Sequence, residues 1–592
     1  MDRSIRLLLS LLMSVVLVPF TASAQSGIEQ YFSPYGRVAQ IEGTEAAVKS
    51  YFADIASRSD TIYAYLYIPG QSPRLEFAMD KYDALLKAAD PDAEFVLISV
   101  NCPEKAAMWY NKRHGYEADY YICDEDMAYM DFLSFSTAVP AGGYALKVDK
   151  AGGRVLCCGA FAYSSKEFYD ALVAYTGTQP FCTHSGDNSR LPLPRDVRHT
   201  DLTYEVHGVE MPDSLGAIFG VMSIASRDGL LLVADSFHDF GLCFSRSGDG
   251  TYGFVREFAP DESEKYMYFD VPDSLFGTAT SLSYIMPLSV MFLPDGDLGM
   301  LIDLPKIVYD ADDGFFYYNM PAILTRDAQT FEPDGVIRFD HVFDDTDEYY
   351  YNFFFASVLA GEQMMICMTK LGWPVLTKEE VAGQPQSDPF KAEYYDGSPC
   401  YVMVDGRTGS KTSRFGRLPD VFRRTLTGDY FLKGPSASFG SEFVYSDGVS
   451  GEICLADISA PDDVKRVYKA FDTGEPAEPD TSKFYTLDYM TDYENHYFRR
   501  TISSVKLRQD KIYLLVSIKP SAGSNYLSEM LYEYREVDRS SGEVVTSFMV
   551  AKQSEDESVL SATLSDDAVP RIAYLSEEDG DYSIKFVTGA GR

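Results

Sequence analysis

The sequence predicts a multidomain chain, with a small α/β domain followed by a larger all-β domain built of repeated sheets. Up to residue 178, apolar strands alternate with helical patterns, as in α/β domains. After residue 196 the helical patterns give way to short strands and turns that recur along the chain. The 592 residues are 46% hydrophobic, which is enough apolar material for more than one core.

The first segment, residues 1–24, has the three parts of a secretory signal peptide. Arg3 and Arg6 form a positive start, residues 7–20 form an apolar run, and Ala22-Ser23-Ala24 is a small-residue cleavage site. The apolar run is shorter than the roughly 20 residues of a membrane span, which disfavours an uncleaved anchor. We therefore expect cleavage near Ala24, no membrane span in the mature chain, and a location in the periplasm, at the cell surface or outside the cell.

The α/β domain is expected over residues 28–178. Two continuous apolar runs, 61–68 and 94–100, have the composition of strands buried on both faces. A turn at Lys150-Ala151-Gly152-Gly153 predicts a hairpin between strands 144–149 and 153–157. Helical patterns occupy four further segments, namely 46–57, 73–86, 104–114 and 166–175.

This element order resembles the thioredoxin-like fold. The loop Gly70 to Arg74 lies where a thioredoxin carries its CxxC motif, between the first central strand and its helix. Matching Pro73 to the proline inside that motif places Gln71 and Arg74 at the two cysteine positions. Redox exchange needs a thiolate, which neither side chain supplies. The resemblance therefore implies a thioredoxin-like module without redox activity.

Residues 179–196 are rich in Pro, Ser, Gly and Asp and have no periodicity, so they predict a linker.

The all-β domain then covers 197–592. One unit recurs six times, at intervals of roughly 60 residues: an apolar strand, a polar turn, a second apolar strand and a third strand. The six first turns are expected at Asp228-Gly229, Asp295-Gly296, Ala360-Gly361, Asp447-Gly448, Gln509-Asp510 and Asp566-Asp567.

Units of this length suit the blades of a β-propeller. The last unit ends after its third strand, and the segment 201–206 before the first unit can supply its missing outer strand and so close the ring. In its repeats the chain resembles six-bladed β-propeller proteins of the NHL and TolB-like type. Two consecutive β-sandwiches are the alternative.

In a propeller, the loops after the second strands commonly line one mouth of the central channel. Polar groups that converge there form the default candidate for a ligand site. Solvated loop tips at similar places in every blade are the alternative. The candidate ligand-binding residues at these positions are Asp235, His238, Asp303, Lys370, Asp457 and Lys519.

The sequence contains no catalytic motif of the GxSxG, HExxH or P-loop type. Its nine cysteines include no CxxC pair, and none of its seven histidines pairs with another at a metal-ligand spacing. We therefore expect no catalytic residue, no bound metal and no cofactor. A formal net charge of −38 repels polyanions and argues against nucleic-acid binding.

These observations favour an exported, non-catalytic binding protein built on a propeller scaffold. Its partner is an unidentified protein, small molecule or glycan. The alternative is a propeller hydrolase or lyase, metal-assisted in one version, that acts on a small exported substrate. A role related to thiol redox chemistry comes third, because the thioredoxin-like module lacks the cysteines that such a role needs.

Overall fold

The computed structural model describes residues 38–160, 196, 204–210 and 221–589, with internal gaps of which the longest are 70–93, 136–143, 340–349, 520–529 and 551–557. The expected signal peptide, the helices at 73–86 and 166–175, and the candidate residues Gln71, Arg74 and His238 lie outside the described residues. The chain divides into two compact units. The first contains Met1–Gly186, Tyr268–Tyr284 and Pro305–Tyr318; the second contains Asp187–Met267, Ile285–Leu304 and Asn319–Arg592.

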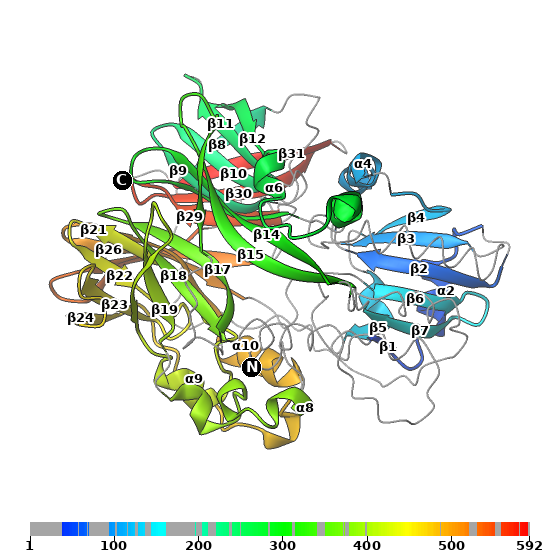
Figure 1. Ribbon diagram of the computed structural model, residues 1–592. Helices are drawn as coiled ribbons and strands as arrows, with labels where there is room; N and C mark the ends of the chain where they lie inside the picture. Colours follow the sequence, from blue (N-terminus) through cyan, green and yellow to red (C-terminus); the bar gives the residue numbers. More distant parts are fainter. Residues whose placement is uncertain are drawn as a thin grey trace. The chain divides into compact units, whose positions relative to one another are not determined.

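The first unit contains a five-stranded mixed sheet in the order β4-β3-β2-β6-β7 (Figure 1). Strands β2, β3 and β4 are parallel, whereas β6 runs antiparallel to β2 and to β7. Parallel neighbours cannot be joined by a tight hairpin turn, so the connections between β2, β3 and β4 must cross over the sheet. The sheet strands are β2 (Thr61–Tyr67), β3 (Phe95–Val100), β4 (Tyr120–Asp124), β6 (Tyr144–Asp149) and β7 (Arg154–Ala160).

The predicted strands and hairpin of this unit are confirmed at β2, β3, β6 and β7. All six residues of β3 are buried, as its continuous apolar sequence requires. Two helices are α2 (Glu45–Tyr51) and α4 (Glu104–His114), and a small separate sheet pairs β1 (Val38–Gln40) with β5 (Leu133–Phe135). Strand β4 was not expected, because it is a short edge strand whose side chains are mostly half-exposed.

The second unit has a β-propeller-like arrangement of antiparallel four-stranded sheets (Figure 1). Four sheets are separate, and we name each by its first strand. The β13 sheet contains β13 (Met286–Phe292), β14 (Leu298–Asp310), β15 (Gly314–Arg326) and β16 (Pro333–Arg338); Pro305–Tyr318, the part of β14 and β15 around their connection, is grouped with the first unit. The β17 sheet contains β17 (Tyr350–Leu359), β18 (Gln363–Lys370), β19 (Tyr401–Asp405) and β20 (Lys411–Phe415). The β21 sheet contains β21 (Ser436–Phe439), β22 (Glu442–Tyr445), β23 (Glu452–Asp457) and β24 (Arg466–Lys469). The β25 sheet contains β25 (Arg500–Leu507), β26 (Lys511–Ile518), β27 (Leu531–Asp538) and β28 (Val544–Val550).

The remaining eight strands form one sheet in the order β29-β30-β31-β8-β12-β11-β10-β9. Among the described residues, the strand pairing between its two halves is that of β8 with β12, which run parallel over two residue pairs. The expected closing strand is confirmed, because β8 pairs antiparallel with β31, with His207 opposite Phe586. The strands are β8 (Tyr204–Glu210), β9 (Val221–Arg227), β10 (Leu230–Asp235), β11 (Phe240–Arg246), β12 (Tyr252–Phe258), β29 (Ser558–Leu564), β30 (Pro570–Glu578) and β31 (Asp581–Gly589).

The first strands contact one another in a closed cyclic order, β9-β13-β17-β21-β25-β29 and back to β9. Polar side chains bridge several of these neighbours: the hydroxyls of Ser223 and Ser289 lie 3.1 Å apart, and those of Ser504 and Thr563 lie 3.4 Å apart. The apolar cores lie between successive sheets. Met364 and Ile366 of β18, for example, share one cluster with Leu301 of the preceding sheet.

Five of the six expected first turns lie between a first and a second strand, but the fourth was placed wrongly. Asp447-Gly448 joins β22 to β23, whereas the first turn of that sheet is at Gly440, between β21 and β22. Strands β21 and β22 have four residues each, so they give a weak periodic signal. Because Asp447-Gly448 carries the stronger turn signal, the sequence predicts it as the first turn of this sheet, although it is the second.

Three helical connections form a layer of their own, which the sequence did not predict. They contain α8 (Lys378–Val381), α9 (Asp420–Thr425) and α10 (Leu487–His496), which lie together in Figure 1. Val381, Phe422 and Tyr489 from these helices belong to one apolar cluster with Tyr401 of β19. We call α8, α9 and α10 the helical layer. Short helices such as α6 (Glu262–Lys265) and α7 (Phe276–Ser281) occur elsewhere.

Among the residues that the structure describes, no helix has both the length and the apolar character that a membrane crossing requires.

Candidate functional site

The two ends of the sheets differ in what they carry. At one end, which we call the turn end, tight turns join first strands to second strands. At the other end, first strands begin, second strands end, and the helical layer is inserted: α8 follows β18, α9 precedes β21 and α10 precedes β25. We call this the cap end. Loops at the end of a rigid scaffold are where binding residues usually lie.

Three of the candidate ligand-binding residues lie at the cap end. Asp235 ends β10, Lys370 ends β18, and Lys519 directly follows β26. All three are buried, with Asp235 fully inaccessible and the two lysines about 5% exposed (Lys370 5%, Lys519 6%). They are therefore not the solvated loop tips of the alternative interpretation. Whether they bind a ligand stays a prediction.

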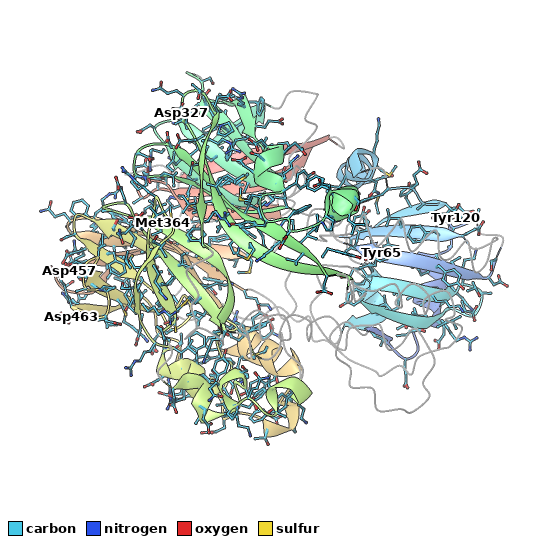
Figure 2. All side chains as sticks on the ribbon, in the orientation of Figure 1. Tyr65, Tyr120, Asp327, Met364, Asp457 and Asp463 are labelled. Carbon is cyan, nitrogen blue, oxygen red and sulfur yellow. The ribbon has the colours of Figure 1, made fainter. Side chains whose placement is uncertain are left out.

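Two other candidates differ from the expectation. Asp303 is opposite Met286, the first residue of β13, and so is level with the cap end, but it lies inside β14 and not in a loop, because β14 continues to Asp310 and forms a long hairpin with β15. Asp457 ends β23, the third strand of its sheet, so it lies at the turn end. Its carboxylate pairs with Lys465 at 2.7 Å, and the residue is labelled in Figure 2. The one-strand shift described above accounts for this misplacement.

Asp447 is the second residue after the second strand β22, at the cap end. Its carboxylate accepts hydrogen bonds from the backbone N–H groups of Val449 and Ser450, both at 2.7 Å. Burial raises its pKa, and the hydrogen bonds from Ser450 and Val449 oppose that shift. Gly448 then adopts φ +93°, which a residue with a side chain rarely adopts. Asp447 therefore acts as a turn cap.

Lys370 is held between strand β18 and the helical connections. Its Nζ donates to the carbonyl oxygen of Tyr394 at 2.5 Å and lies 4.2 Å from the centre of the Tyr394 ring. Its backbone N–H donates to Asp429, whose other carboxylate oxygen accepts from the Tyr394 hydroxyl, both at 2.7 Å. Burial lowers the pKa of Lys370, and the nearby Asp429 carboxylate only partly opposes this shift.

Lys519 pairs with the helical layer. Its Nζ lies 2.8 Å from Glu494 of α10, and the two side chains are 7% and 20% exposed. Glu494 also attracts Lys433, which lies just before β21 and whose pKa is lowered by burial. The Glu494 carboxylate thus interacts electrostatically with two basic residues, one from each of two neighbouring sheets.

Two arginines complete this region at the start of β25. Arg499 donates from Nε and Nη2 to the Lys519 carbonyl oxygen, at 3.3 and 3.2 Å. Burial, and then the adjacent Arg500, lower the pKa of Arg499. Arg500 is buried and pairs with Asp196. We define the cap-end basic cluster as Lys370, Lys433, Arg499, Arg500 and Lys519, all of which come from the β17, β21 and β25 sheets or the connections that precede them.

The cap-end basic cluster can bind anions, since a lysine or arginine that is already desolvated forms strong charge-assisted hydrogen bonds. No group of three or more His, Cys, Asp or Glu residues suited to a metal ion occurs in the described part of the chain. The acidic residues near the cluster include Asp429, Glu494, Asp196 and Asp447. The arrangement is thus suited to electrostatic recognition.

The sequence-based search missed Lys433, Arg499, Arg500 and Glu494. It considered only residues after second strands, although first strands begin at the same end of an antiparallel sheet. Arg499-Arg500 directly precedes the apolar alternation of β25, and that signal was available. Glu494 could not be found in this way, because nothing local shows that α10 packs near β26.

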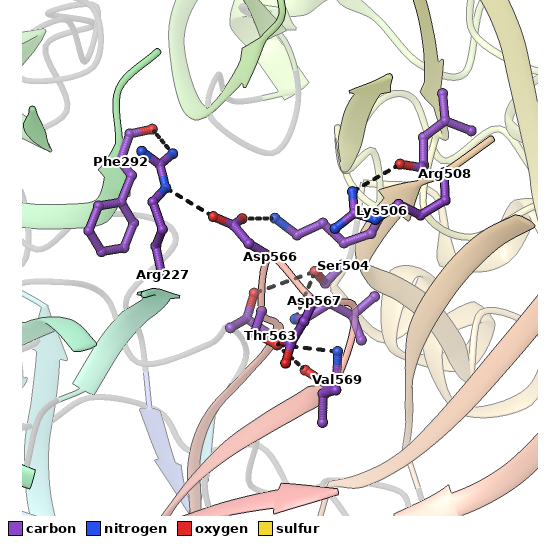
Figure 3. A network of polar contacts seen from close by, with 12 residues as sticks. Arg227, Phe292, Ser504, Lys506, Arg508, Thr563, Asp566, Asp567 and Val569 are labelled. Atoms are coloured by element: carbon purple, nitrogen blue, oxygen red, sulfur yellow. Dashed lines mark hydrogen bonds and ion pairs between the residues drawn. The ribbon is translucent and has the colours of Figure 1, made fainter. Parts of the chain in front are cut away.

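The turn end carries a different network, shown in Figure 3. The Asp566 carboxylate, in the turn between β29 and β30, accepts from Arg227 Nε of β9 and Lys506 Nζ of β25, both at 2.9 Å. Arg227 also donates to the carbonyl oxygens of Phe292 and Leu293 at the end of β13. We call this network the turn-end clasp. It links four of the first strands, and its single carboxylate is shared by two cations.

No family model matches this chain, and no curated protein matches it in sequence. Solved structures do resemble it. The periplasmic gluconolactonase PpgL of Pseudomonas aeruginosa is 8% identical, with a TM-score of 0.29, 62% of this chain covered and 85% of that chain. The soluble aldose sugar dehydrogenase of Escherichia coli is 10% identical, with a TM-score of 0.31 and coverages of 66% and 100%.

The sialidase of Trypanosoma rangeli in complex with the inhibitor DANA is 11% identical, with a TM-score of 0.33 and coverages of 68% of this chain and 60% of that chain. At these identities and TM-scores, the three structures assign neither a family nor an activity to this chain.

Proposed function

We propose that the chain is an exported, non-catalytic binding protein that recognises an anionic ligand at the cap end of its β-propeller. The observation that carries this proposal is the cap-end basic cluster. A chain with a net charge of −38 gathers five basic residues at one end of three neighbouring sheets. Lys370, Arg500 and Lys519 among them are buried.

The charge balance of the cluster favours a ligand of negative charge. Burial lowers the pKa of both Lys370 and Lys433, because the charged form of each lysine is desolvated. A bound anion would favour the charged forms and would raise both pKa values. Electrostatic attraction by a positive site also raises the rate at which an anionic ligand finds it.

The proposal is tested with citrate as the probe and the mature chain as the protein. Isothermal titration calorimetry compares the wild type with Lys370→Gln and Lys519→Gln. Losing one charge-assisted hydrogen bond costs about 1.5–3 kcal/mol, so each variant is expected to bind citrate about ten-fold more weakly or worse. Lys391→Gln is the matched control, because Lys391 is exposed next to the helical layer.

Equal citrate affinities in all four proteins would contradict the proposal. A pH series gives a second readout. Since the anion favours the charged lysines, its affinity is expected to fall as the pH rises through their lowered pKa values, and to do so at a lower pH than for an ordinary lysine.

We also propose that the ring has six blades of the NHL and TolB-like type over residues 197–592. The cyclic contact order of six first strands supports this number. The eight-stranded sheet then comprises two blades, since its halves are joined by the short pairing of β8 with β12. A low-resolution density map along the ring axis would count the blades directly.

For the N-terminal part we propose a thioredoxin-like domain over residues 28–178, joined to the ring by the linker 179–196. The strand order β4-β3-β2-β6-β7 supports it, because three parallel strands with an antiparallel hairpin at one edge match the element order expected for that fold. We expect no turnover in insulin reduction. N-terminal sequencing of the exported chain is expected to begin near Gln25, after cleavage of residues 1–24.

A further inference from the structure

Two arginines of the β25 sheet converge on one carboxylate from a distant part of the sequence. Arg500 donates from Nη1 and Nη2 to the two carboxylate oxygens of Asp196, at 2.9 and 2.5 Å. Arg535, in β27, donates from Nη2 to Asp196 Oδ2 at 3.1 Å. The paired geometry at Arg500 is the one that guanidinium groups use to recognise carboxylates.

The two guanidinium groups are buried and lie beside the same aromatic ring. The side chains of Arg500 and Arg535 are 5% and 4% exposed, and both guanidinium carbons lie near the ring of Phe471, at 5.3 and 5.9 Å. Arg535 is held further by the carbonyl oxygen of Ala470 and by Glu533, which is fully buried. We call Arg500 and Arg535, with the Phe471 ring beneath them, the arginine clamp.

The arginine clamp needs a carboxylate from outside its own sheet. Glu533 pairs with Arg535 and compensates one of the two positive charges. The second charge is compensated by Asp196, 304 residues away along the chain. A buried guanidinium without a partner is costly, so the clamp is stable only when an anion occupies it.

The occupant is more exposed than the clamp. The Asp196 side chain is 52% exposed, whereas the arginines that bind it are at least nine-tenths buried. Burial raises the pKa of Asp196, but its hydrogen bonds with Arg500 and Arg535 outweigh this and lower the pKa to about 2. Arg500 Nε is buried and has no hydrogen-bond partner among the described residues, so Asp196 leaves one donor of the clamp unused.

We propose that the arginine clamp is a carboxylate-binding site that Asp196 occupies as a tethered internal ligand, and that the carboxylate group of an external ligand binds there by displacing it. The tether gives Asp196 a high effective concentration, which sets the threshold that a competing ligand must exceed. A ligand with a second polar group has an advantage over Asp196, because Arg500 Nε remains available. This inference shares Arg500 with the cap-end basic cluster, but it involves neither Lys370 nor Lys519, the two residues whose substitution tests the proposed function.

The test uses the mature chain, acetate as the probe, and sodium chloride at matched ionic strength as the reference. Asp196→Ala empties the clamp without adding a new group to it. We expect this variant to melt at a lower temperature than the wild type and to be restabilised by acetate in a saturable manner. We also expect it to bind acetate at least about ten-fold more tightly than the wild type, because the internal competitor is gone.

Two further variants make the result specific. Asp196→Asn keeps the shape of the occupant without its charge, so it is expected to lose stability and to gain less affinity for acetate than the alanine variant. Adding Arg500→Lys to Asp196→Ala removes the paired geometry but keeps the charge, and it is expected to abolish the acetate-specific shift.

Acetate shifts in Asp196→Ala no larger than those of chloride would overturn the proposal, and so would equal acetate affinities in the wild type and Asp196→Ala. The failure of this inference is distinguishable from that of the proposed function, which is judged by citrate binding to Lys370→Gln and Lys519→Gln.

Discussion

Replacing Glu264 with glutamine is expected to destabilise the region around α6 strongly, although only one atom type changes. Glu264 lies in α6, and its carboxylate accepts from both terminal nitrogens of Arg326, at 2.8 and 2.5 Å. The side chains of Arg326 and Glu264 are 2% and 6% exposed, so the pair is buried. Arg326 ends β15 and also donates to the carbonyl oxygens of Thr325 and Ala259.

The magnitude follows from what the substitution leaves behind. Removing one partner of a buried ion pair leaves an uncompensated charge, at a cost of about 3–5 kcal/mol. The capping box at the start of α6, in which Glu264 Oε2 accepts from the Asp261 N–H at 2.9 Å, survives in the variant because a glutamine can also accept. The expected loss is therefore the ion-pair value alone. It is much smaller in Glu264→Leu/Arg326→Met, where neither charge remains.

Hydrogen exchange followed by mass spectrometry is the appropriate assay, because it reports on one region of a chain with several domains. The backbone amides of α6 and of the end of β15 are expected to lose protection by roughly 100-fold or more in Glu264→Gln, since each 1.4 kcal/mol is about a factor of ten. The exposed pair Arg256–Glu332 gives the control, because its loss costs about 1 kcal/mol or less. A loss of protection in Glu264→Gln no greater than that in Glu332→Gln would refute the reasoning.

Three further predictions concern the two ends of the ring. Asp566→Asn is expected to destabilise the turn-end clasp by about 1 kcal/mol or less per ion pair, with a smaller effect at high salt. Hydrogen exchange in β9 and β25 measures this effect, and unchanged exchange would mean that the clasp does not stabilise the ring. Asp457→Asn is expected to leave citrate binding unchanged, because this residue lies at the turn end, and a weaker affinity by calorimetry would contradict that placement. The pKa of the Asp196 carboxylate is lowered to about 2, so its contribution to folding stability is complete above the ordinary value of 3.8 and is lost as the pH falls towards 2. If Asp196→Ala unfolded in acid with the same pH profile as the wild type, this prediction would be wrong.

The local features of the fold could be predicted from the sequence where each strand carried its own signal. The buried strands β2 and β3 are continuous apolar runs, and the closing strand β8 was expected from a repeat that lacked its last strand. Strands β21 and β22 carry too few residues for a clear alternation, and this shortness moved one turn and with it Asp457. The length of β14 could not be predicted, because Asp303 interrupts its apolar stretch and so suggested an end to the strand, whereas the strand continues to Asp310.

The candidate site could be predicted only in part, because its groups come from separate connections. Lys370 and Lys519 share one position in the repeat, and that position could be read along the chain. Glu494 and Asp196 reach the same end of the ring from α10 and from the segment before β8, and no periodic pattern relates them to the strands. Sequence periodicity locates residues within a sheet, whereas partners from insertions depend on tertiary packing.

The two ends of the ring differ in the way their charges are compensated, and this difference argues for function at the cap end. At the turn end, Asp566 is half-exposed and its two partners are only partly buried, so water shares the task of solvating them and the network gains a modest stability. At the cap end, Lys370, Lys519 and Arg500 are buried, and they rely on acids supplied by insertions and by a distant segment. A scaffold selected for stability alone would gain more from apolar side chains at such positions. The three buried cations of the cap end therefore support the proposed recognition of an anion, in which the internal acids hold the site in its binding geometry.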